Sequence, residues 1–160
     1  MPSKTRVIIA LGVLVLIIAA VLGIEALRRR QSATPDLPPG SVPITLNGEF
    51  VAAFTPADLE QLQQVSFVDA EEGKTQEGWL LRDVLHLTVE DMAWTPQTQV
   101  TVVSNSKSVQ LTWAEIDDPA NWVMFDLAGR GTLKLVSVLE RLNTRDEWVQ
   151  DVTSLVIEQP

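Results

Sequence analysis

The feature that most constrains this chain is an apolar run close to its N-terminus. Residues 7–24 contain no charged side chain and are apolar on every face that a helix would present. A helix on a water-soluble domain shows a polar stripe, whereas a helix in lipid needs none because it satisfies its own backbone hydrogen bonds. Extended to Leu27, the run gives a helix of about 31 Å, which matches a bilayer core. The sequence therefore predicts a transmembrane anchor over residues 7–27, after a tail over residues 1–6.

A cleaved signal peptide is the competing interpretation of this segment. Such a peptide has an apolar region of about 7–15 residues and then a cleavage site between small residues. Here the run is longer, and it ends in a stretch from Glu25 to Arg30 that includes three arginines. We therefore expect an uncleaved, single-pass anchor. Lys4 and Arg6 precede the run and three arginines follow it, so the positive-inside rule leaves the orientation open.

The anchor is followed by a basic and then proline-rich linker over residues 28–42. Proline density of the kind seen from Pro35 to Pro43 favours extended polyproline II, at about 3 Å per residue, so the linker can hold a domain up to ~40 Å from the bilayer. Residues 43–160 have the size of one globular domain. We expect this domain to face an aqueous compartment beside the membrane.

The charge balance and the residue types of the domain exclude several functions. Residues 41–160 hold nineteen acidic and seven basic side chains, a surface that repels nucleic-acid phosphates. The chain has no cysteine, which rules out disulfides, thiolate zinc sites, iron–sulfur clusters and cysteine nucleophiles. His86 is the only histidine, so no poly-histidine metal site exists. We expect no metal ligands and no catalytic residues.

Short β-type runs, interrupted by a few helical segments, fill the domain. Asn47-Gly48 joins the first two runs and is a strong hairpin signal. Helices are expected after Thr55 and Thr112, which can cap them, and over residues 78–87. The pattern predicts an α+β fold with a mixed, largely antiparallel sheet and short helices. The expected strands are residues 42–46, 50–54, 65–68, 99–103, 108–111, 122–127, 133–138 and 152–157.

Three stretches, in this order, carry a resemblance to a known family. They are TPADL at 55–59, GWLLRDVL at 78–85, and GRGTLKLV at 129–136 followed by WVQDVTSLVI at 148–157. Together they resemble the sulfite-oxidase-like molybdopterin-binding family (oxidoreductase molybdopterin-binding domain), in its short membrane-anchored form, over about residues 42–158 of this chain. The resemblance implies an extracytoplasmic α+β domain that in full-length relatives holds a molybdenum cofactor.

The chain departs from this family at the metal ligand. The relatives ligate molybdenum with one cysteine thiolate, and this chain has none. Fold likeness does not transfer chemistry when site residues are missing. From the resemblance we expect a non-catalytic binding or accessory module of a membrane-associated redox system, with protein partners in the membrane. A molybdopterin-dependent oxidoreductase with a non-cysteine metal ligand and a structural subunit of a membrane complex stay open as alternatives.

Two places in the domain are candidate binding sites. Arg130 and Lys134, after a glycine turn, could present cations and backbone N–H groups to a pterin phosphate or another anion. The alternative is a glycine turn that enters a strand with polar side chains on its exposed face. Trp94 precedes Thr95-Pro96 in an expected loop, which makes it a candidate for contact with a partner; packing inside the domain is the alternative. His86 is expected on the polar face of its helix, as a solvated or capping side chain; a catalytic base or a ligand is the alternative.

Overall fold

The computed structural model describes residues 36–160, and these lie in one compact unit, Asp36–Pro160. The anchor predicted over residues 7–27 and the first part of the linker lie outside the described residues. Among the residues that are described, no helix has the length and apolar character needed to cross a membrane.

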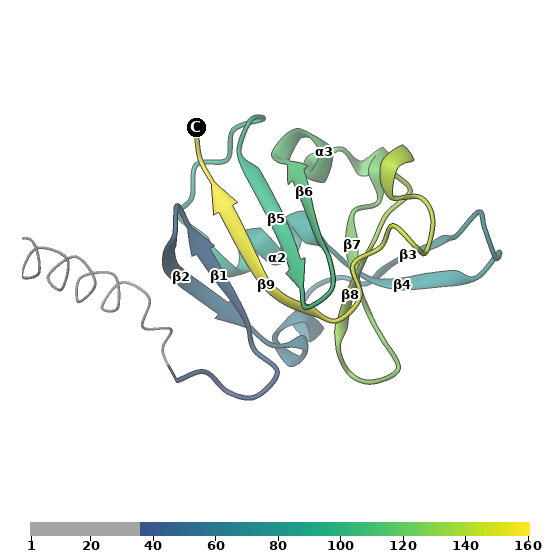
Figure 1. Ribbon diagram of the computed structural model, residues 1–160, viewed down its shortest axis with the longest axis horizontal. Coiled ribbons are helices and arrows are strands. Elements are labelled where there is room, and N and C mark those ends of the chain that lie inside the picture. Colours follow the sequence, from purple (N-terminus) through teal and green to yellow (C-terminus); the bar gives the residue numbers. More distant parts are fainter. Residues whose placement is uncertain (1–35) are drawn as a thin grey trace, which may run out of the picture. The chain divides into compact units, whose positions relative to one another are not determined.

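The described domain is α+β, as the sequence predicts, and its strands form two sheets (Figure 1). The five-stranded sheet has the order β2-β1-β9-β5-β6 and is mixed, because β1 and β9 run parallel while the other pairs are antiparallel. The four-stranded sheet, β3-β4-β7-β8, is antiparallel throughout. The strands are β1 Val42–Leu46, β2 Glu49–Phe54, β3 Val65–Val68, β4 Thr75–Leu80, β5 Gln99–Ser104, β6 Ser108–Thr112, β7 Met124–Leu127, β8 Leu133–Val136 and β9 Val152–Glu158.

Short helices connect the strands. Two are α-helices, α2 (Leu81–Thr88) and α3 (Trp113–Asp117), and three are 3₁₀ helices, η1 (Pro56–Gln61), η2 (Pro119–Asn121) and η3 (Glu140–Leu142). The predicted caps hold: Thr55 with Asp58, and Thr112 with Glu115, form capping boxes at η1 and α3. The spacing of Leu81, Val84 and Leu85 buries one face of α2 in the core, also as predicted.

The Asn47-Gly48 hairpin between β1 and β2 is confirmed. Both residues adopt positive φ, 50° for Asn47 and 86° for Gly48, which is the backbone that a type I′ turn requires. Asn47 also fixes the end of the chain, since its Oδ1 accepts a hydrogen bond of 3.0 Å from the backbone N–H of Gln159. The turn therefore brings the first hairpin and the C-terminus together.

The strand prediction is wrong at three places. It misses β4, so the described residues hold nine strands and not eight. Because β4 runs to Leu80, α2 begins at Leu81 and not at residue 78. The strand expected from residue 122 begins instead at Met124, as β7, because η2 ends at Asn121 and its C-cap residue, Trp122, has a φ of 46°, in the left-handed region. The strand expected over residues 133–138 ends at Val136, as β8, since the Ser137 hydroxyl donates to the Asn121 carbonyl (2.6 Å) and the chain turns there.

Two groups of buried side chains hold the domain together. The main core lies between the two sheets and α2 and contains Ile44, Leu85, Phe125 and Leu155, all fully buried. A smaller cluster on the other face of the four-stranded sheet is built from Met124, Val136 and Trp148. The four-stranded sheet is therefore covered on both faces over part of its area.

Candidate functional site

Arg130 and Lys134, the two cations predicted to bind an anion, each form an ion pair with a different carboxylate. Arg130, in the turn before β8, pairs with Asp151 at 2.7 Å, and Thr132 donates to the other oxygen of the same carboxylate. Lys134, in β8, pairs with Asp126 of β7 at 2.9 Å. Each cation is thus neutralised within the domain, and an anion at either one must compete with a carboxylate already in place.

The Lys134 pair belongs to a polar chain that crosses the four-stranded sheet. Lys134 and Asp126 are each only 14% exposed, and the ammonium also donates to Gln76 Oε1 at 2.8 Å. Gln76 in turn donates to the buried carboxylate of Asp69 at 2.9 Å. The hydrogen bond from the Glu72 backbone N–H, helped by Gln76, holds the pKa of Asp69 below its ordinary value despite burial. Satisfied buried networks of this kind stabilise one arrangement of a sheet.

This donor set does not fit a pterin phosphate. Asp151 contacts Arg130 and Asp126 contacts Lys134, and these carboxylates repel a phosphate because they carry charge of the same sign. The described part of the chain also contains no group of three or more histidine, cysteine or acidic side chains arranged to hold a metal ion. Binding of an anion at Arg130 and Lys134 stays a prediction, and we derive no chemistry from it.

His86 and Trp94 meet in one aromatic cluster. Trp94 stacks on Trp113, with ring centroids 4.1 Å apart and planes 19° from parallel. The exposed ring of His86 contacts the two indoles edge-on, at 6.0 Å from Trp94 and 5.3 Å from Trp113. Trp94 is half-buried, so its stacked face serves internal packing and only the rest of its ring is free for a partner. The predicted partner contact of Trp94 stays a prediction.

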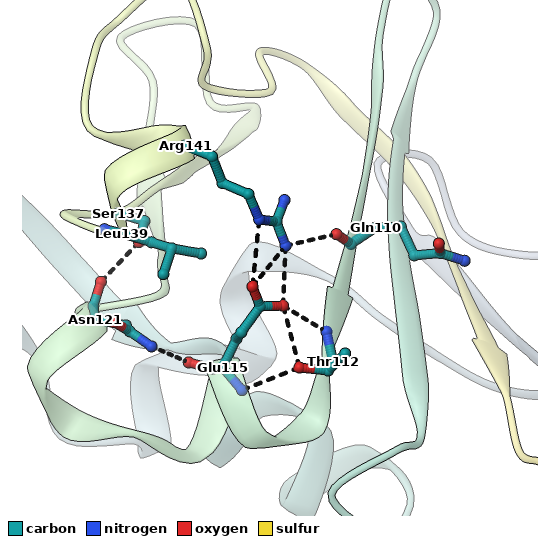
Figure 2. A network of polar contacts seen from close by, with 7 residues as sticks. All are labelled: Gln110, Thr112, Glu115, Asn121, Ser137, Leu139 and Arg141. Carbon is teal, nitrogen blue, oxygen red and sulfur yellow. Dashed lines mark hydrogen bonds and ion pairs between the residues drawn. The ribbon is translucent and has the colours of Figure 1, made fainter.

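A second polar network of the domain surrounds Glu115 (Figure 2). Glu115 Oε2 accepts from the backbone N–H (2.8 Å) and the hydroxyl (3.1 Å) of Thr112, and Arg141 from η3 donates to both carboxylate oxygens. Arg141 also donates to the Gln110 carbonyl at 2.9 Å. Burial raises the pKa of Glu115, but the bonds from Thr112 and Arg141 outweigh it and leave that pKa below its ordinary value. This network joins β6 and α3 to the segment after β8.

The remaining basic residues of the domain also contact oxygen acceptors within the domain. Every lysine and arginine in residues 41–160 contacts a carboxylate or backbone carbonyl oxygen of a described residue, as Lys107 does with the Asp146 carbonyl at 2.8 Å. By contrast, eight exposed carboxylates of residues 41–160 make no ion pair or hydrogen bond with any described residue. They are Glu49, Glu60, Glu77, Glu90, Asp91, Glu140, Asp146 and Glu158. The described surface therefore carries unopposed negative charge.

Two grooves lie at the end of the domain that contains the C-terminus, on either side of Gln159. One encloses about 450 Å³ and is lined by apolar side chains of β1, β2 and the segment after α2, with Glu90 and Asp91 among the lining residues. The other, about 440 Å³, is lined mainly by polar residues and by Glu158. The apolar members of the first groove are Leu46, Val51, Val89, Met92 and Ala93. These volumes lie within the range of about 300–1,000 Å³ that is typical of ligand sites.

The sequence alone does not predict the groove that is lined by apolar side chains. Its walls come from the first hairpin, from residues 88–93 and from Gln159, which are far apart in the chain. The only local signal was the apolar-acidic run from Val89 to Met92, in a segment that no expected helix or strand includes. Searches for known proteins like this chain returned no matching family model and no matching curated protein.

Proposed function

We propose that this chain is a membrane-anchored accessory module whose acidic domain binds a basic protein partner and performs no reaction of its own. The proposal keeps the transmembrane anchor over residues 7–27 and the sulfite-oxidase-like fold as its framework. The α+β architecture is compatible with that fold. The link to a membrane-associated redox system comes from the resemblance alone.

One observation carries the proposal, namely the distribution of charge on the described surface. Each of the seven cations of residues 41–160 contacts a carboxylate or carbonyl oxygen of the same domain, while the eight unpaired carboxylates named above are exposed. Such a surface attracts cationic partners over distance and repels anionic ones, which raises the association rate and favours one kind of partner. A binding role uses this distribution of charge directly.

Co-purification at two salt concentrations tests this function. The full chain, extracted from its own membranes in a non-ionic detergent, should retain a partner protein at 50 mM NaCl and lose most of it at 1 M NaCl. The reason is that the screening length falls from about 10 Å at 0.1 M to about 3 Å at 1 M salt. Recovery of the chain without a stoichiometric partner at low salt would contradict the proposal.

Elemental and pterin analysis of the same preparation separates this function from the oxidoreductase alternative. The chain has no cysteine to supply the thiolate ligand of the related enzymes. We therefore expect molybdenum far below one atom per chain and no pterin fluorescence. Stoichiometric molybdenum with electron-transfer activity would establish an enzyme instead.

A further inference from the structure

The apolar groove beside Gln159 combines an apolar lining with an acidic one. Leu46, Val89 and Met92 are half-buried and pack against the main core, and Val51 is 40% exposed on β2. β2 is an edge strand of the five-stranded sheet, so one side of its backbone has no pairing strand. The groove is therefore lined by apolar side chains that pack against the main core and are still accessible to a binding partner.

Hydrogen bonds within the domain hold the groove in shape without a partner. Gln159 crosses between its walls: its backbone N–H donates to Asn47 Oδ1, and its side-chain amide donates to the Ala93 carbonyl, each at 3.0 Å. These bonds join the first hairpin, the segment after α2 and the end of β9, which lie close together in Figure 1. A preformed site loses less conformational entropy on binding than one that must first be assembled.

The charge of the groove is entirely negative. Glu90 and Asp91 are exposed, and no described cation pairs with either of them. Glu158 lines the neighbouring groove on the other side of Gln159, and it too is unpaired among the described residues. No lysine or arginine lines either groove. An occupant that supplies cations next to an apolar side chain would complement both the lining and the charge.

We propose that this groove docks a short segment of the partner protein in which apolar side chains alternate with lysine or arginine. The inference rests on the proposed function and gives it a location and a partner chemistry. The apolar side chains of the segment cover Val51 and Met92, and its cations approach Glu90 and Asp91. Anionic lipid headgroups and nucleic acids share the sign of the groove and are repelled from it.

Peptide binding to the full chain in a non-ionic detergent tests the site. The probe is a fluorescein-labelled octapeptide in which lysine and leucine alternate, measured by fluorescence anisotropy at 50 mM NaCl. Two control peptides replace leucine by serine, or lysine by glutamate, and both should bind at least about tenfold more weakly because each lacks one of the two complementary features.

Two matched pairs of variants locate the site on the domain. Glu90→Gln with Asp91→Asn should weaken the lysine–leucine peptide about five- to tenfold, whereas Glu60→Gln with Asp146→Asn, which removes the same charge outside the groove, should change it less than about twofold. Val51→Ser should weaken binding about threefold, and Val68→Ser, at another exposed edge-strand valine, should not. Thermal denaturation of each variant confirms that it is folded.

The outcomes distinguish the groove from the function as a whole. Equal weakening by the two charge pairs, or no binding of the lysine–leucine peptide at 50 mM NaCl, overturns the groove assignment. Salt-sensitive co-purification with a partner can still be observed in that case, and the proposed function then stands without this site. Loss of co-purification at low salt removes the proposed function whatever the peptide does.

Discussion

Glu115 shows how one carboxylate serves two structural tasks in this domain. It completes the capping box of α3 with Thr112, and it holds the guanidinium of Arg141 from η3 (Figure 2). Its side chain is 29% exposed and that of Arg141 47% exposed, so solvent screens the pair in part. The contribution to stability therefore comes from the cap and the ion pair together.

Replacing this carboxylate tests that role through the pH dependence of stability. Because the pKa of Glu115 is lower in the folded than in the unfolded state, its contribution is fully present above the unfolded-state pKa of about 4.3 and is lost as the pH falls through the lower, folded-state pKa. We expect Glu115→Gln to destabilise the protein by about 1–2 kcal/mol at pH 7 in urea unfolding. The difference from the wild type should shrink towards pH 3.5; a constant difference would show that the charge of Glu115 contributes nothing.

Gly78 in β4 is a second residue with a sharp structural requirement. A Cβ atom at this position would overlap the carbonyl oxygen of Phe125 and come within 2.7 Å of its carbonyl carbon, in the paired strand β7. Backbone cannot move away as a flexible side chain can. We expect Gly78→Ala to destabilise the domain by about 3 kcal/mol. Gly129→Ala is the control, since nothing lies within 4 Å of its Cβ, and a similar loss there would refute the steric explanation.

At the scale of elements, the β1–β2 hairpin depends on its two turn residues. Gly48 has a φ of 86°, which costs a residue with a Cβ roughly 1–2 kcal/mol. We expect Gly48→Ala to lower the free energy of unfolding by about 1 kcal/mol, and Gly48→Asn by less, because asparagine tolerates the left-handed region. Equal stability of the wild type and both variants, measured by thermal denaturation, would contradict a required type I′ turn.

Most strands could be predicted from local patterns, and the exceptions have physical reasons. Hairpin and cap signals act within a few residues, so β1, β2, η1 and α3 follow from sequence alone. β4 could not be predicted in this way, because its buried polar residue Gln76 is hydrogen-bonded to Asp69 and Lys134. Those partners lie seven and 58 residues away along the chain. Without them the Thr75–Glu77 stretch has the polarity of a loop.

The predicted site residues show the same limit. Positive charge at Arg130 and Lys134 can be read from the sequence, but their carboxylate partners come from β7 and from the residue before β9. The stacking of Trp94 on Trp113 likewise joins a loop to α3. The groove beside Gln159 depends on three separate segments. Local patterns locate chemical groups, whereas tertiary contacts decide which of them are free to bind.

At the scale of the whole molecule, the proposed anchor predicts where the domain lies relative to the membrane. From the resemblance we expect the domain to lie outside the cytoplasm, carried by the anchor over residues 7–27. Protease added to intact cells should then remove residues 43–160, and membranes should retain the chain after a carbonate wash because a membrane-spanning helix is not extracted. A domain protected in intact cells but digested after lysis would place it in the cytoplasm.

In the function that we propose, unpaired carboxylates of the domain recruit a basic partner. The most direct test compares the partner retained by the wild-type chain with that retained by a full-length variant carrying Glu49→Gln, Glu90→Gln, Asp91→Asn and Glu158→Gln, both extracted from membranes at 50 mM NaCl. All four side chains are exposed and unpaired among the described residues, so the variant should fold normally. We expect its partner yield to fall at least about fivefold. An unchanged yield from a folded variant would contradict the claim.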